Sequence, residues 1–186
     1  MKRCSWAESH ELETIYHDTQ WGIPVHNDQK LFEMLMLEAM QAGLSWLTIL
    51  KKMETFSEAY DHWDYRIIAT YDDQKIEELL SNPGIIRHPL KVKAAINNAQ
   101  KFLAIQEEFG SFDTYIWGFV DGQPIMNHWK EMSEVPGTTK LSEKISKELK
   151  KRGFKFLGST TVYAFMQSIG MVNDHVEDCF CKYSTK

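Results

Sequence analysis

A carboxylate stands in the middle of an otherwise apolar helical pattern near the start of the chain. The pattern repeats at helical spacing and consists of Leu31, Met34, Leu35, Glu38, Ala39 and Ala42. A buried carboxylate must be paired, hydrogen-bonded or neutralised. Two interpretations are open: Glu38 bonds to backbone within a core helix, or it hydrogen-bonds a ligand that stacks on nearby Trp46.

Aromatic side chains are frequent in the same part of the chain. Four of them are candidates for one cluster, namely Trp6, Tyr16, Trp21 and Trp46. Their flat π faces bind flat ligands, and bind them better when the ligand is a cation. Filling of the hydrophobic core is the alternative. Together with Glu38, these rings describe a slot for a nucleobase.

Cysteine and histidine occur in pairs near both ends of the chain. His175 and Cys179 are four residues apart, so one helical turn would bring both to the same ion, and Cys4 and His17 would supply the second pair. Two thiolates and two imidazoles complete a tetrahedral zinc site with no open position, which is a structural site. The alternative is two core cysteines and two surface histidines without a metal. Cys181 is left over, and it either replaces Cys179 or is inert.

A basic turn is predicted between two helices at residues 81–93. Gly84 and the following helix N-terminus leave backbone N–H groups free to bind a phosphate, and Arg87, Lys91 and Lys93 add positive charge beside them. The alternative is an ordinary turn with solvated basic side chains.

The composition restricts the class of protein. The 186 residues are 43% hydrophobic, enough for a substantial core, and carry a net charge of −5, which argues against a general polyanion binder but not against a local basic face. No apolar run reaches membrane-spanning length, and residues 1–8 do not resemble an export signal. Three cysteines do not form a disulfide framework. We therefore expect a cytoplasmic protein without a membrane partner.

Helical periodicity dominates the chain and predicts an all-α fold. Asp28 is expected to cap the helix that contains Glu38, and the break at 41–45 has Gly43 for a left-handed conformation and Ser45 as the next cap. Asp113 is interpreted as a helix cap. Further helices are predicted at 11–16, 57–65, 65–71, 74–80, 90–109, 115–119, 141–151 and 160–169, and the one stretch with a strand-like pattern is 154–157.

These residues together resemble the bacterial type I 3-methyladenine DNA glycosylase family. The resemblance runs from Arg3 to about Cys179, and its motifs are specific when taken jointly. The matching segments are Arg3-Cys4 with Trp6, Tyr16-His17-Asp18, Trp21-Gly22, Leu31-Phe32-Glu33-Met34, Gln41-Ala42-Gly43-Leu44-Ser45-Trp46, Gly84-Ile85-Ile86-Arg87-His88, Lys150-Lys151-Arg152-Gly153-Phe154-Lys155-Phe156 and Val172-Asn173-Asp174-His175-Val176.

The resemblance implies the helix–hairpin–helix DNA glycosylase fold with a cleft between two lobes. One lobe would comprise residues 28–110 with the hairpin, and the other residues 1–27 and 111–186. It implies one structural zinc ion, joining the terminal segments, on the four residues Cys4, His17, His175 and Cys179. It also implies a base pocket formed by Glu38, Tyr16 and Trp46, with Trp21 and Trp6 nearby, in which Glu38 and Tyr16 are the catalytic residues.

The implied reaction is hydrolysis of the N-glycosidic bond of 3-methyladenine in alkylated duplex DNA by a monomer, which leaves an abasic site and releases the free base. Residues Gly43 and Leu44 would enter the gap left by the extruded nucleotide, while Gly84, Arg87, Lys91 and Lys93 grip the backbone. Lys91 is the one lysine that could instead form a Schiff base.

The hairpin departs from the wider superfamily, which usually has Gly-x-Gly there and a catalytic aspartate after the next helix. Here only Gly84 is present, and the nearest later aspartate is Asp113. A 3-methylated base is a cation and a good leaving group, so less acid–base assistance is needed. Rival hypotheses are a glycosylase for another lesion, such as N3-methylguanine or an oxidised or mismatched base, and a zinc-containing module that binds DNA or a protein without catalysis.

Overall fold

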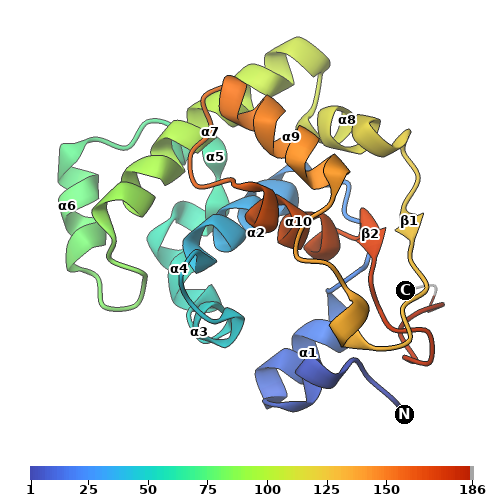
Figure 1. Ribbon diagram of the computed structural model, residues 1–186. Coiled ribbons are helices and arrows are strands. Elements are labelled where there is room, and N and C mark those ends of the chain that lie inside the picture. Colours follow the sequence, from blue (N-terminus) through green and yellow to red (C-terminus); the bar gives the residue numbers. More distant parts are fainter. Residues whose placement is uncertain (185–186) are drawn as a thin grey trace.

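The computed structural model describes residues 1–184, and helices dominate it (Figure 1). The predicted all-helical class is thus confirmed, apart from one short pair of strands. The α-helices are α1 (Glu11–Thr19), α2 (Asp28–Gln41), α3 (Trp46–Leu50), α4 (Met53–Ala59), α5 (Tyr65–Ile68), α6 (Asp73–Ser81), α7 (Pro89–Phe109), α8 (Phe112–Trp117), α9 (Lys140–Lys151) and α10 (Ser159–Ser168). Short 3₁₀ helices are η1 (Ser5–Glu8), η2 (Asp61–Trp63), η3 (Gly118–Val120) and η4 (Met132–Glu134).

Helix α2 lies at the centre of the molecule and is buried over most of its length (Figure 1). It packs against α3, α7, α8 and α10, so helices from both halves of the sequence surround it. The predicted apolar face is buried from Leu31 to Ala39, whereas Ala42 lies just after the helix and is exposed. Met36, Leu37 and Met40 on its flanks are buried as well. Because α2 is covered on nearly all sides after its first turn, Glu38, which follows Leu37 in the middle of the buried stretch, lies in the interior.

The start of α2 differs from the prediction by one residue, with a structural consequence. Asn27, not Asp28, is the N-cap, and its side-chain oxygen accepts a hydrogen bond from the backbone N–H of Lys30 at 2.9 Å. The Asp28 carboxylate instead accepts from the backbone N–H groups of Phe112 and Asp113, both at 2.9 Å. Asp28 therefore satisfies the exposed N–H groups at the start of α8 and fixes α8 to α2.

Two turns place the residues of interest for DNA binding. In the turn after α2, Gly43 has φ +79°, a left-handed conformation that suits glycine, and the Ser45 side chain caps α3 by accepting from Thr48 N–H at 3.2 Å. Both predictions for this turn are confirmed. A second turn, residues 82–88, joins α6 to α7, and His88 caps α7.

The two ends of the described chain lie side by side (Figure 1). The Phe180 N–H donates to the Lys2 carbonyl at 3.0 Å. Strand β1 (Ile125–Met126) pairs in parallel with β2 (Val172–Asn173), with Ile125 opposite Val172. The expected strand at 154–157 is wrong: this stretch is irregular, and Phe156 has φ +58°. Within residues 1–184, no helix combines the length and the apolar character that crossing a membrane requires.

Candidate active site

A cavity of about 290 Å³ lies where the N-terminal segment, α2, α3 and α10 meet. It is near the lower end of the usual volume range of ligand pockets, about 300–1,000 Å³, which suits a single heterocycle. Its lining includes all five residues predicted for the base pocket. The lining residues are Trp6, Glu13, Tyr16, Trp21, Glu38, Gln41, Trp46, Met132, Ala164 and Gln167.

Aromatic rings form the walls of this cavity. The rings of Tyr16 on α1 and Trp46 on α3 are 5.2 Å apart at an interplanar angle of 52°. Trp6 meets Trp21 edge to face, with ring centroids 5.1 Å apart. These contacts fix the orientation of each ring, since tilted and edge-to-face pairs are the favoured geometries. The result is a preformed slot whose side walls are π faces.

Glu38 projects from α2 into this aromatic slot and is only 5% exposed. Burial raises the pKa of its carboxyl group from the ordinary 4.5 to about 8, because removal from water disfavours the charged form. Burial and the proximity of Glu38 also raise the pKa of Tyr16. In the empty pocket both groups therefore keep their protons at neutral pH.

Three polar groups of the slot have no hydrogen-bond partner among residues 1–184. They are Glu38 Oε2, the Tyr16 hydroxyl and Trp46 Nε1, all of them buried. Buried polar groups are nearly always satisfied, so three orphaned groups in one cavity indicate that a ligand with complementary donors and acceptors completes them. The open question of whether Glu38 bonds to backbone is thus answered for Oε2, which has no such bond.

The raised pKa leads to a prediction about stability. The unfolded carboxyl group loses its proton near pH 4.5, whereas the folded one keeps it up to about pH 8, so this group makes folding less favourable as pH rises through that interval. Glu38→Gln removes the effect. Glu38→Gln should therefore gain melting temperature relative to the wild type as the pH rises. We expect the difference, variant minus wild type, to be about 10 °C larger at pH 8 than at pH 5. Calorimetry at both pH values measures it, and an equal difference at both would contradict the buried neutral carboxyl group.

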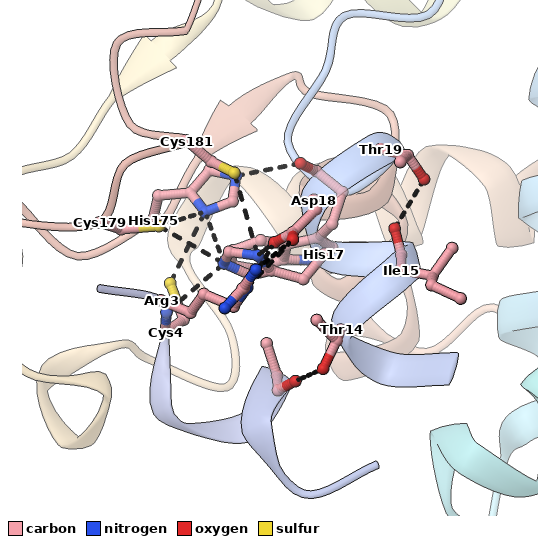
Figure 2. A network of polar contacts seen from close by, with 12 residues as sticks. Arg3, Cys4, Thr14, Ile15, His17, Asp18, Thr19, His175, Cys179 and Cys181 are labelled. Atoms are coloured by element: carbon pink, nitrogen blue, oxygen red, sulfur yellow. Dashed lines mark hydrogen bonds and ion pairs between the residues drawn. The ribbon is translucent and has the colours of Figure 1, made fainter. Parts of the chain in front are cut away.

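The four predicted metal ligands come together next to this slot (Figure 2). Nδ1 of His175 is 3.2 Å from Nε2 of His17, 3.6 Å from Sγ of Cys4 and 3.5 Å from Sγ of Cys179. A tetrahedral ion with bonds of about 2.3 Å to sulfur and about 2.05 Å to nitrogen requires about 3.3 Å between nitrogens and about 3.6 Å between nitrogen and sulfur. The four side chains are thus spaced to hold one metal ion.

The outer nitrogens of both histidines are also occupied (Figure 2). His17 Nδ1 lies 2.8 Å from the Asp18 carboxylate, which Arg3 holds through hydrogen bonds of 2.8–3.0 Å. His175 Nε2 lies 3.0 Å from the Trp21 carbonyl oxygen. Such contacts fix the ring orientation and the tautomer of metal-binding histidines.

The leftover thiol, Cys181, is outside the four-residue group. Its Sγ lies 3.9 Å from His17 Nδ1, on the side of the ring that faces away from the other ligands. Cys179, in contrast, is 3.5 Å from His17 Nε2. Of the two alternatives for this position, the geometry favours Cys179 as the ligand.

The residues predicted to face DNA lie at a second location, a shallow groove between the turn after α2 and the α6–α7 turn. Leu44 and Arg87 line this groove, and Lys93 is exposed on α7. The prediction that Lys91 contacts DNA is wrong. Lys91 is only 5% exposed, and its ammonium group donates to two backbone carbonyls, so it does not point toward DNA.

Asp113, predicted to be a cap, pairs with His26 at 2.7 Å, and Ser111 caps α8.

Sequence reasoning did not assign five of the lining residues to the slot, namely Glu13, Gln41, Met132, Ala164 and Gln167. Met132 belongs to the loop at 120–138, in which no pattern was visible. Gln167 lies on α10, and its amide nitrogen donates to the buried Asp174 carboxylate at 2.9 Å. Because Asp174 fixes that amide, the Gln167 side chain is a rigid part of the wall. The sequence predicted a helix at 160–169 but gave no signal for a ligand.

Fold and cavity together define the class of this protein: a helical protein with an aromatic pocket into which unpaired polar groups project. A family described as methyladenine glycosylase matches residues 6–182. The DNA-3-methyladenine glycosylase of Haemophilus influenzae is 46% identical over 98% of both chains, and DNA-3-methyladenine glycosylase 1 of Escherichia coli is 44% identical over 97% of both. A crystal structure of a variant of 3-methyladenine DNA glycosylase I in complex with 3-methyladenine is 36% identical, covers 99% of each chain and has a TM-score of 0.95.

The chain therefore belongs to the methyladenine glycosylase family. This confirms the family and the enzyme class that the sequence motifs predicted.

Proposed function

We propose that this protein excises 3-methyladenine from alkylated duplex DNA and that Glu38 recognises the cationic base. The observation that carries the proposal is the set of orphaned donors and acceptors on Glu38, Tyr16 and Trp46 within one aromatic slot. Methylation at N3 gives adenine in DNA a positive charge, and a cation stacks well between aromatic faces. Support comes from the relatives named above, which carry this activity in their names.

The proposed chemistry is hydrolysis. The C1′–N9 bond breaks, its electron pair passes to the base and cancels the positive charge, and water adds to C1′ with release of a proton. The products are the free base and an abasic site. A cation next to Glu38 favours the ionised carboxylate, and the resulting negative charge in a dry pocket holds the flipped, cationic base in the slot. It thereby raises the fraction of bound DNA in which the C1′–N9 bond can break. Because the ammonium group of Lys91 is buried on backbone carbonyls, we infer no Schiff base and no strand cleavage.

We propose that the segment α6–turn–α7 is a helix–hairpin–helix element that binds the DNA backbone. Gly84 in the hairpin and the exposed cations Arg87 and Lys93 support this assignment. Leu44, which is 39% exposed at the tip of its turn, would enter the base stack when the damaged nucleotide is flipped into the slot. The shared groove places both features on one face of the protein.

The chain divides, in our proposal, into a hairpin lobe of residues 28–110 and a terminal lobe of residues 1–27 and 111–186, of which residues 185 and 186 lie outside the described part of the chain. The slot draws Glu38 and Trp46 from the first and Trp6, Tyr16 and Trp21 from the second, as expected for a pocket in a cleft between lobes. We further propose that the protein acts as a monomer in the cytoplasm, where its DNA substrate and reduced thiols are both found.

We propose that the Cys/His group holds one structural zinc ion. The ligand set would be Cys₂His₂, made of Cys4, His17, His175 and Cys179. Four protein ligands leave no open coordination position, which is typical of structural zinc sites, and their spacing is the one described above. The ion would join the two ends of the chain and hold the N-terminal wall of the slot in place.

The experiment that tests the function is incubation of the purified protein with methylated duplex DNA, followed by identification of the released bases. We expect 3-methyladenine as the main product and intact strands with abasic sites. Release of a different damaged base alone would show that 3-methyladenine is not the substrate. DNA binding without release of any base would show that the protein is a binding module and not a glycosylase.

A further prediction concerns the hairpin. Arg87→Ala should weaken binding to undamaged duplex DNA about 3- to 10-fold and lower the slope of log affinity against log salt by about 1, because one phosphate contact is lost. Fluorescence anisotropy at several salt concentrations measures both quantities. Arg66→Ala is the control, since Arg66 is exposed on α5 outside the groove. An unchanged salt slope for Arg87→Ala would remove Arg87 from the interface.

A further inference from the structure

Lys91 is a buried lysine that the chemistry above does not use. It belongs to the first turn of α7, directly after the hairpin, yet its side chain runs inward between α2 and α7 and is only 5% exposed. Apolar groups, including Met36, Ala39 and Phe156, surround its stem. Burying an ammonium group is costly, and burial lowers the pKa of Lys91, so a specific interaction must compensate.

The compensation comes from the C-terminal end of α2. Lys91 Nζ donates to the Met40 carbonyl at 2.8 Å and to the Ala42 carbonyl at 2.6 Å. The last carbonyls of a helix have no hydrogen-bond partner within the helix and carry partial negative charge. A lysine ammonium group there supplies the missing donors and a compensating positive charge. The Ala42 carbonyl belongs to the turn that presents Leu44, and Leu44 N–H donates within the same turn to the Gln41 carbonyl at 2.7 Å.

A second set of contacts joins the far side of this turn to the hairpin. Lys52, just after α3, donates to the Pro83 carbonyl at 3.2 Å, and the Thr55 hydroxyl on α4 bonds to the Gly84 carbonyl. The turn with Leu44 is thus attached to the hairpin through α3 and α4 and to the start of α7 through Lys91. In both connections the acceptors are backbone carbonyls, so each connection fixes the main chain of a turn and not only a side chain.

We propose that Lys91 is a positioning residue that links the hairpin, which binds the DNA backbone, to the turn that carries Leu44. Through this link, binding of the phosphates by the hairpin determines how deeply the Leu44 side chain enters the base stack. This inference rests on the proposed function. Lys91 touches neither the base nor the phosphates in this arrangement. It acts through the position of the turn, which it holds by two hydrogen bonds to main chain.

Lys91→Met tests the link, because methionine keeps the length and apolar packing of the stem but removes the donors. We expect excision of 3-methyladenine from methylated duplex DNA to fall about 10-fold, while the affinity for free 3-methyladenine, followed by tryptophan fluorescence, changes less than 2-fold. Lys91→Arg, which retains donors and charge, should recover part of the rate. Lys101→Met on the same helix is the matched control and should excise like the wild type.

Two further measurements separate positioning from a general loss of structure. Amide hydrogen exchange at Leu44 should be at least 5-fold faster in Lys91→Met than in the wild type, with unchanged exchange in α10. In a double-mutant cycle, Lys91→Met should cost little extra in a Leu44→Ala background, because the turn then has no side chain to position. Wild-type excision by Lys91→Met, unchanged exchange at Leu44, or fully additive effects would each overturn the proposal.

The same data distinguish this proposal from the proposed function. If the wild-type protein releases no base at all, the function fails, whereas the exchange result still reports whether Lys91 holds the turn. If the wild type excises and the exchange and cycle results are negative, only the role of Lys91 fails.

Discussion

Glu38→Gln should reduce the excision of 3-methyladenine from duplex DNA by about 100-fold or more while leaving a folded protein. The glutamine keeps the shape of the side chain and a hydrogen-bond acceptor, but it cannot become negative when the cationic base enters. Loss of one preorganised electrostatic group in a dry site typically costs about 100- to 1,000-fold in rate. Because the carboxyl group is neutral in the empty pocket, its loss should not weaken folding.

Single-turnover release of base from methylated DNA measures this effect. Glu33→Gln is the matched control, since Glu33 lies on the same helix but bonds to Lys30 at 3.1 Å and does not line the slot. It should excise at the wild-type rate. A folded Glu38→Gln protein with wild-type excision would remove Glu38 from the mechanism and leave stacking as the only recognition.

Loss of a metal ligand should have the second large effect. Cys4→Ser and His175→Ala are each expected to abolish bound zinc and to lower the melting temperature by about 10 °C, which corresponds to a few kcal/mol in a chain of this size. The reason is geometric, because the proposed ion would join Cys4 to His175, which are 171 positions apart in the sequence. Metal analysis of the purified variants and calorimetry test both parts.

Cys181→Ser is the control for the metal site. Its thiol lies beyond the His17 ring, so the variant should keep its zinc and most of its thermal stability. Full zinc content in both Cys4→Ser and His175→Ala would contradict the proposed site. If Cys181→Ser loses its zinc while Cys179→Ser retains it, Cys181 and not Cys179 is the zinc ligand.

The sequence predicted the slot well because its residues are unusual where they stand. A carboxylate on an apolar helical face, as for Glu38, violates the expected pattern, and such violations concentrate at functional sites. The four candidate metal ligands, which the fold brings together, were identifiable because Cys and His are chemically distinctive. Helix ends were also well marked where glycine or serine is required, as at Gly43 and Ser45.

The prediction failed where a side chain acts across the fold. Asp28 has the right type and place for a cap, but its carboxylate caps α8, which lies more than eighty residues away along the chain. Lys91 likewise reads as a surface cation in a basic turn, and only the packing of α7 on α2 shows that its ammonium group is internal. Met132 and Gln167 were missed because neither residue type carries a chemical signal, and tertiary structure alone brings them to the slot.

The contact between His175 Nε2 and the Trp21 carbonyl has a consequence for how the protein is made. Trp21, one aromatic wall of the slot, emerges early from the ribosome, but His175, which bonds to its carbonyl and meets its ring edge to face, follows 154 positions later. A nascent chain that still lacks this last segment contains Glu38 and the hairpin but no finished slot. We therefore expect a chain that ends before His175 to lack this support for the Trp21 wall.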